Sequence, residues 1–181
     1  MPDPGWSRGD KESVLPLRAQ IEGSPETVGD LILAAEQRYR EGRALMTGGR
    51  WGAGIYLVGY SAEMYLKTAC FQVTGSRLAD QVRPLLRWAV AEGRAAFPAV
   101  RNESCHSLLF WAHLLLRERR RAGLAPWSPM TRRQFLSHVG KLYSTWWVEM
   151  RYRPDRARPA DGLNILSWTG WLRLNHPVLW R

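Results

Sequence analysis

The chain has 181 residues, of which 45% are hydrophobic, so it is long enough for one domain with a buried core. Its formal charge of +10 favours an acidic partner, nucleic acid above all, while a generally basic surface is the plainer interpretation. Its two cysteines exclude a disulfide framework, and no uncharged run reaches the ~20 residues of a membrane span. We therefore expect a cytoplasmic protein without a membrane segment.

The N-terminal part of the sequence predicts an arm followed by a helix. Residues 1–23 mix proline, glycine and charged residues, and we expect them to form an arm outside the main core. Ser24, Pro25 and Glu26 then form a helix start signal, with a capping hydroxyl, a proline in the first turn and an acid near the positive end of the dipole. Apolar residues follow at helical spacing as far as the glycines at positions 48 and 49. This helix should pack antiparallel to the next one.

The stretch from residue 49 to residue 72 predicts a helix that is buried on almost every side. It is apolar on several faces and has no charged residue from position 51 to position 62. Its glycines at positions 52, 54 and 59 each weaken a helix by about 0.5–1 kcal/mol relative to alanine, so they indicate that neighbouring helices approach closely. Glu63 and Lys67 share one face of this helix. They form either a simple stabilising pair or part of a buried charged cluster that marks a site.

The remainder of the chain predicts three further helices and a C-terminal extension. Apolar residues recur at helical spacing in residues 80–97, 105–121 and 128–150, and prolines at positions 98 and 154 end the first and the last of these. A short helix is expected from Leu163 to Leu174. The predicted fold is an all-α, up-and-down bundle of about five helices over residues 24–154, on which the extension 155–181 packs.

Two groups of arginines are candidates for contact with nucleic acid. One crowds the C-terminal end of the helix in residues 105–121, where cations also complement the helix dipole, and the other lies in the proline-broken loop after position 150. The alternative for both is a solvated basic face. The candidates are Arg117, Arg119, Arg120, Arg121, Arg153, Arg156 and Arg158.

Several short motifs occur in an order that is typical of one known family. They are Gly59-Tyr60, Ala62-Glu63 and Leu66-Lys67 in the central helix, His106 and Leu108 at the start of a later helix, and Arg151-Tyr152 at the end of another. In these motifs residues 26–154 resemble the HEPN family, the higher eukaryotes and prokaryotes nucleotide-binding domain. The resemblance implies a bundle of four or five helices, often a dimer, frequently encoded in toxin, defence or RNA-processing systems.

Many HEPN proteins are metal-independent endoribonucleases with an arginine, four to six intervening residues and a histidine. Arg101, Asn102 and His106 match that pattern, with the polar residue directly after the arginine. Such cleavage needs a base for the 2′-hydroxyl proton and a cation for the charge on the phosphate. At a helix N-terminus, where the dipole disfavours a cation, His106 is expected to be neutral and to act as the base, while Arg101 holds the phosphate.

The resemblance leaves alternatives open at these positions. Arg132 and Arg133 also stand at a permitted spacing before His138, and in the family the nuclease motif usually belongs to a later helix than the one that His106 opens. His113, deep in an apolar stretch, is expected to be a core residue. Glu63 is expected to bind Arg151, with Lys67 and Tyr152 as supporting residues. No set of metal ligands and no cofactor motif is recognisable in the sequence.

The resemblance therefore predicts an RNA-cleaving HEPN-like protein of a toxin or defence system. We expect a homodimer through the helices near Arg101 to Leu116, which would bring two Arg/His pairs into one cleft. One alternative is a non-catalytic HEPN module that binds a nucleotide or a partner such as a nucleotidyltransferase. Another is a structural subunit of a ribonucleoprotein assembly.

Overall fold

The computed structural model describes residues 26–97, 105–152 and 156–181, with the backbone alone for residues 151 and 152. These ranges contain six α-helices, one 3-10 helix and no strand, since the single β-bridge is isolated. The elements are α2 (Val28–Thr47), α3 (Trp51–Val73), α4 (Val82–Ala96), α5 (Leu108–Arg121), α6 (Pro129–Thr145), η2 (Val148–Tyr152) and α7 (Pro159–Leu179). The predicted all-α bundle is confirmed, with six helices in place of about five. The arm predicted for residues 1–23 lies outside the described residues.

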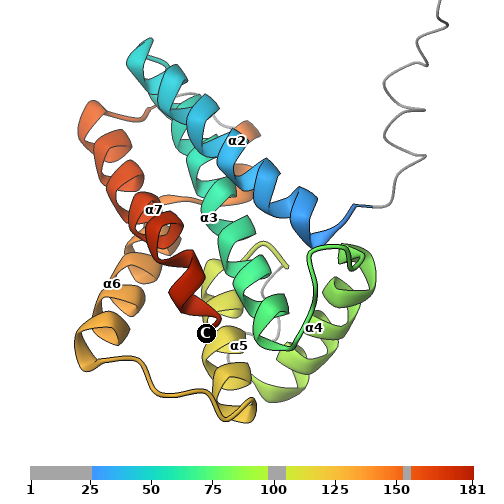
Figure 1. Ribbon diagram of the computed structural model, residues 1–181. Helices are drawn as coiled ribbons and strands as arrows, with labels where there is room; N and C mark the ends of the chain where they lie inside the picture. The colour runs from blue at the N-terminus through green and yellow to red at the C-terminus, as the bar shows by residue number, and fades with distance from the viewer. Residues whose placement is uncertain (1–25, 98–104, 153–155) are drawn as a thin grey trace, which may run out of the picture.

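Helices α2 and α3 form an antiparallel hairpin that runs the length of the molecule (Figure 1). In the turn between them Gly49 has a φ of 76°, a region that favours glycine. The predicted helix start at Ser24 is too early, because α2 begins after Thr27. The Thr27 hydroxyl accepts from the Asp30 amide at 3.1 Å, and the Asp30 carboxylate accepts from the Thr27 amide at 3.0 Å. This capping box needs an acid three residues after the cap, which a start at Ser24 would lack.

Two of the glycines in α3 allow the close approach that the sequence predicts. A Cβ atom on Gly54 would lie 2.7 Å from the carbonyl oxygen of Gly42, so the backbones of α2 and α3 meet there. A Cβ atom on Gly59 would lie 2.2 Å from the indole of Trp146, so the neighbour at this position is a side chain. Both positions need glycine because no other residue leaves this space open.

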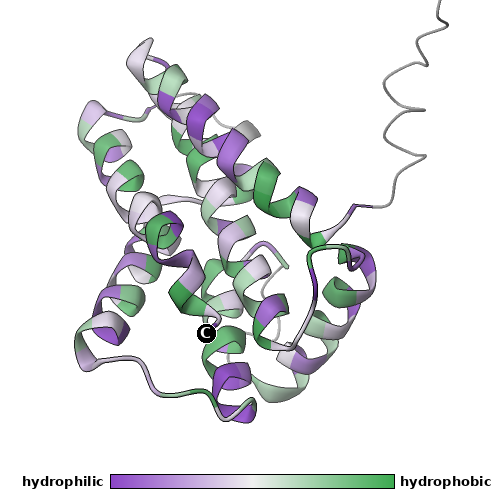
Figure 2. Ribbon diagram, in the orientation of Figure 1, coloured by the Kyte–Doolittle hydropathy of each residue, from purple (hydrophilic) through white to green (hydrophobic). Residues whose placement is uncertain are grey.

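Helix α3 is the centre of the bundle. All residues from position 61 to position 71 are buried, and α2, α5 and α7 pack around this helix. Figure 2 shows that α5 is hydrophobic in its first turns, where it packs on α3, and hydrophilic in its last turn. None of the helices in the described part of the chain is both long enough and apolar enough to cross a membrane.

The end of α6 and the length of α7 differ from the prediction. α6 stops at Thr145 and not near residue 150, because Trp146 adopts an extended conformation with φ −120° and ψ 137°. Its buried indole donates to the Tyr56 carbonyl at 3.0 Å, and the 3-10 helix η2 follows. The short helix expected from Leu163 to Leu174 is the 21-residue α7, which packs along α3 and α6 as a full member of the bundle.

Candidate functional site

The carboxylate of Glu63 is the centre of a charged cluster inside the bundle. The residue is 1% exposed, and its Oε1 atom lies 2.5 Å from Nζ of Lys67 on the next turn of α3. Nδ1 of His106, from the segment that leads into α5, lies 3.0 Å from Oε1 and 3.1 Å from Oε2 of the same carboxylate. A buried carboxylate is stable only with such partners. The sequence-based hypothesis of a buried charged cluster on α3 therefore matches the observed geometry.

Local interactions at the start of α5 fix the position of His106. The hydroxyl of Ser107, the N-cap residue, accepts from the Phe110 amide at 3.2 Å, which places His106 directly before the first turn. The indole of Trp111 donates to the Cys105 carbonyl at 2.8 Å and ties the preceding residue to the same helix. The Tyr60 ring stacks on the imidazole with a centroid distance of 6.3 Å.

The contact with Glu63 determines which ring nitrogen of His106 carries a proton. A carboxylate only accepts hydrogen bonds, so Nδ1 of His106 carries a proton and, in a neutral ring, Nε2 carries the lone pair. Lys67 balances the carboxylate, and its Nζ atom also lies 5.3 Å from the centre of the Trp111 ring. Glu63, Lys67 and a neutral His106 thus have no net charge. The His106 side chain is 33% exposed, so a ligand can reach it.

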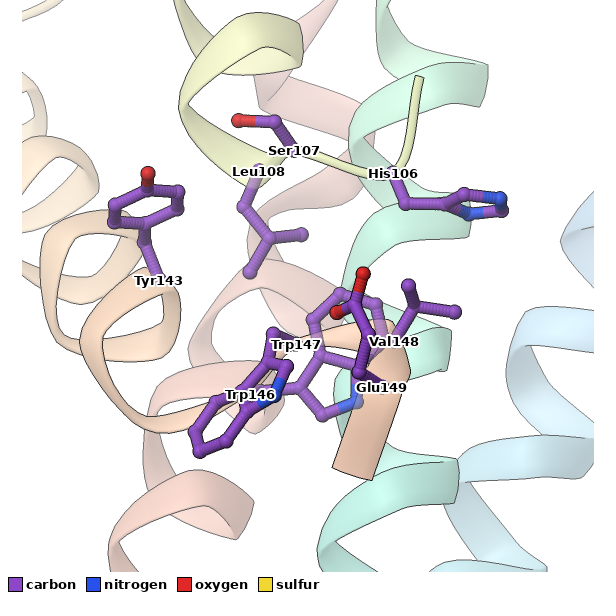
Figure 3. A pocket seen from close by; sticks show the side chains of 8 residues that line it. All are labelled: His106, Ser107, Leu108, Tyr143, Trp146, Trp147, Val148 and Glu149. Carbon is purple, nitrogen blue, oxygen red and sulfur yellow. The ribbon is translucent and has the colours of Figure 1, made fainter. Parts of the chain in front are cut away.

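A pocket of about 340 Å³ adjoins His106 (Figure 3). The Tyr143 ring and His106 lie on opposite sides of it, the indoles of Trp146 and Trp147 lie below, and the Glu149 carboxylate points up between them. The imidazole itself projects from the edge of the pocket across α3, toward Glu63. The pocket therefore offers aromatic surface and one carboxylate beside an oriented histidine.

Several predicted site residues cannot be placed. Arg101, Asn102 and Arg153 lie outside the described residues, as do the side chains of Arg151 and Tyr152. The expected ion pair between Glu63 and Arg151 therefore stays a prediction, and the described partners of Glu63 are Lys67 and His106.

The arginines at the end of α5 are largely engaged within the protein. Arg119 is 5% exposed, and its guanidinium donates to the carbonyls of Leu179, Arg181 and Ala125. It therefore anchors the end of α7 and does not present its charge to an RNA. Arg117 and Arg121 both form ion pairs with Glu92 and Glu118, and Arg158 pairs with Asp161. Arg120 and Arg156 are exposed.

The other histidines of α5 and α6 differ in their surroundings. His113 is exposed and contacts the Phe97 ring at 5.7 Å, so the prediction that it is a core residue is wrong. His113 lies on the side of α5 that faces away from α3. Because this stretch is apolar on several sides, its sequence does not show which side of the helix is buried. His138 packs on the Trp171 ring at 5.2 Å, and burial together with the charge of Lys141 lowers its pKa. Arg133, the other member of this alternative pair, is exposed on α6.

A second polar cluster, which the sequence did not reveal, joins α2, α3 and α7. Arg173 binds the Glu36 carboxylate at 2.8 and 2.9 Å, and the Tyr65 hydroxyl donates to it at 2.5 Å. Burial alone would raise the pKa of Glu36, but these donors outweigh it and lower the pKa. Next to Tyr65, the buried His176 lies 2.9 Å from the Thr68 hydroxyl, and burial lowers its pKa to about 4.

Sequence reasoning also missed the aromatic pocket. The consecutive residues Trp146 and Trp147 with Glu149 close behind are a visible signal, but the predicted continuous helix would have spread them over different faces. The break at Trp146 brings them to one place. Among the described residues no group of three His, Cys, Asp or Glu side chains has a geometry suited to a metal ion.

Comparisons with known proteins do not assign the chain to a family. No protein-family model matches the chain, and neither a curated protein nor a solved structure is significantly similar to it.

Proposed function

We propose that the protein is a metal-independent endoribonuclease in which His106 is the general base. The observation that carries the proposal is the contact of His106 Nδ1 with the buried carboxylate of Glu63, at 3.0 and 3.1 Å. In enzymes that use a histidine base, a buried carboxylate at one ring nitrogen orients the imidazole and stabilises the cation that forms when the other nitrogen takes a proton. The site has this carboxylate, and its imidazole is accessible.

The proposed reaction uses the hydroxyl of the RNA itself. His106 Nε2 takes the proton of a ribose 2′-hydroxyl, and the oxygen attacks the adjacent phosphorus while the bond to the 5′ oxygen of the next nucleotide breaks. The products are a 2′,3′-cyclic phosphate and a 5′-hydroxyl, which forms when the leaving 5′ oxygen takes a proton from water. Lys67 holds the Glu63 carboxylate in place. The resemblance to HEPN proteins assigns the stabilisation of the phosphate charge to Arg101 and Asn102.

The wider role follows from the same resemblance. We propose a toxin or defence system in the cytoplasm, in which two copies of the chain pair and a nucleotidyltransferase-type partner controls the activity. The second candidate is a non-catalytic module that binds a nucleotide, and the aromatic pocket beside His106 favours it. In that case the contacts among Glu63, Lys67 and His106 hold the helices together and perform no chemistry.

Cleavage rates of variants test the proposal. RNA is incubated with the wild-type protein in the presence of EDTA, because the proposed groups are a base and a cation and include no metal ligand. The His106→Ala and Arg101→Ala proteins should each be slower by about a hundredfold or more, since a positioned acid or base contributes 10² to 10⁴. Arg133→Ala and His138→Ala serve as matched controls and should cleave normally. Loss in His138→Ala alone would move the site to α6.

A further inference from the structure

The pocket beside His106 has the features of a site for a flat, polar ring. Trp147 is 49% exposed and Tyr143 is 41% exposed, although both are large aromatic residues, and the buried Trp146 lies next to them. Exposed aromatic side chains are the common stacking platforms for unstacked bases of single-stranded RNA. The volume of about 340 Å³ is near the lower limit of ligand pockets and is enough for one base or nucleoside.

Glu149 adds chemical selectivity to this aromatic surface. Its carboxylate points up between the sides of the pocket (Figure 3), and no Lys, Arg or His side chain in the described part of the chain pairs with it. A carboxylate accepts through two oxygens and cannot donate, so it favours a ring edge with two adjacent N–H donors. Among the four RNA bases, guanine presents such an edge, with N1–H beside its N2 amino group.

We propose that this pocket is a guanine subsite, in which Trp147 stacks on the base and the Glu149 carboxylate accepts hydrogen bonds from N1–H and N2–H. This rests on the proposed function, because the subsite holds the base of the nucleotide whose 2′-hydroxyl His106 deprotonates. His106 is one of the residues that line the pocket, so a base inside it leaves the ribose and phosphate beside this residue. Cleavage then follows a guanosine.

The first arm of the test measures binding without cleavage. The wild-type protein is titrated calorimetrically with the 5′-monophosphates of guanosine, adenosine, cytidine and uridine at about 0.15 M salt, which weakens general attraction to a basic protein. Guanosine monophosphate should bind about tenfold or more tightly than the others. Glu149→Gln should remove that preference, since hydrogen bonds to a charged group are worth a factor of about ten or more. Trp147→Leu should weaken all four nucleotides by about fivefold or more.

A matched control separates these effects from loss of charge or of folding. Glu41→Gln removes a carboxylate on α2, outside the pocket, and should leave all four affinities unchanged. Circular dichroism of each variant verifies the helical fold. Equal affinity of the wild-type protein for all four nucleotides, or an unchanged preference in Glu149→Gln, would overturn the guanine subsite.

The second arm identifies the base at the cleaved bond by sequencing the product ends. Fragments should end in guanosine 2′,3′-cyclic phosphate, and Glu149→Gln should spread the ends over other bases. Cleavage that depends on His106 but shows no base preference would overturn the subsite and leave the ribonuclease intact. Glu149-dependent binding of guanosine monophosphate without any RNA cleavage would overturn the ribonuclease and support a guanine site for a free nucleotide.

Discussion

At the scale of single residues, the protein depends on a carboxylate that it buries almost completely. Glu63 is 1% exposed and has two nitrogen partners among the described side chains, Lys67 on its own helix and His106 from the start of α5. The sequence indicates the pair on α3, because residues four apart share a helix face. It does not indicate His106, which is 43 residues away and meets Glu63 only through the packing of α5 on α3.

The burial of Glu63 leads to a prediction about stability. Glu63→Gln removes one member of a buried ionic contact and leaves Lys67 without its partner, which typically costs about 3–5 kcal/mol. For a protein of this size we expect the melting temperature to fall by roughly 10 °C, measured by calorimetry. Glu41→Gln affects a partly exposed ion pair with Arg38 and should change the melting temperature little. A melting temperature of Glu63→Gln within one or two degrees of the wild type would show that the cluster does not stabilise the fold.

His176 leads to a prediction about pH. The Thr68 hydroxyl is placed to donate to the Met64 carbonyl at 2.9 Å, so it accepts from Nε2 of a neutral His176. Burial lowers the pKa of His176 from 6.5 to about 4 in the folded protein. Between these values the unfolded chain binds more protons than the folded one, so the free energy of unfolding decreases as the pH falls from about 6.5 to 4.

The size of this effect can be measured by urea unfolding at pH 7.5 and 4.5. The wild-type protein should lose about 2–3 kcal/mol through His176, since one pKa unit corresponds to about 1.4 kcal/mol. His176→Gln should reduce that loss, whatever its own stability at pH 7.5, and the exposed His113→Gln should not. An equal loss in His176→Gln and the wild type would assign the pH dependence to other groups.

At the scale of helices, the sequence predicts the type of element well and its ends poorly. The apolar pattern predicts the helix α3, and its glycines predict that other helices pack closely against it. Both signals lie within this one segment of the sequence. The end of α6 depends on a tertiary contact, since the Trp146 indole fills the space over Gly59 and binds the Tyr56 carbonyl. The sequence after Pro159 predicts a short helix followed by a tail. In the structure α7 packs against α3 and α6 and extends to Leu179, beyond Pro177 in its last turn.

Two glycine substitutions test this contact. In Gly59→Ala the new Cβ atom would lie 2.2 Å from the Trp146 indole, so the ring and the pocket beside it must shift. We expect a loss of about 1–3 kcal/mol in the free energy of unfolding, measured with urea. Gly140→Ala is the matched control, because nothing lies within 4 Å of its new Cβ atom in α6, and it should stabilise the protein by about 0.5–1 kcal/mol. Equal stability of the two variants would contradict the packing described for Trp146.

At the scale of the whole molecule, α5 uses most of its apolar surface inside its own chain. Leu108, Phe110, Trp111 and Leu115 are all buried in the core. An interface between two copies through this helix would use its outward stripe, with His113 exposed between the partly buried Leu109 and Leu116. The proposed pairing therefore depends on a narrower surface than the apolar sequence of this region suggests.

This pairing is testable in solution. We expect light scattering at micromolar concentration to give the mass of a dimer, and we expect His113→Glu, which places a charge in the stripe, to give the mass of one chain. The exposed Arg133→Glu on α6 is the control and should leave the dimer intact. A wild-type monomer, or a dimer that His113→Glu does not affect, would argue against an interface through α5.

Whether His106 is the base of an RNA cleavage reaction is the central question, and chemical rescue of His106→Ala answers it most directly. Single-turnover cleavage is measured with the wild-type, His106→Ala and His138→Ala proteins, each with and without added imidazole, in EDTA and with any partner protein supplied or absent. We predict that His106→Ala loses about a hundredfold or more, that imidazole restores part of this rate, and that the products carry a 2′,3′-cyclic phosphate. Wild-type activity in His106→Ala, or cleavage by none of the proteins under any condition, would contradict the proposed function.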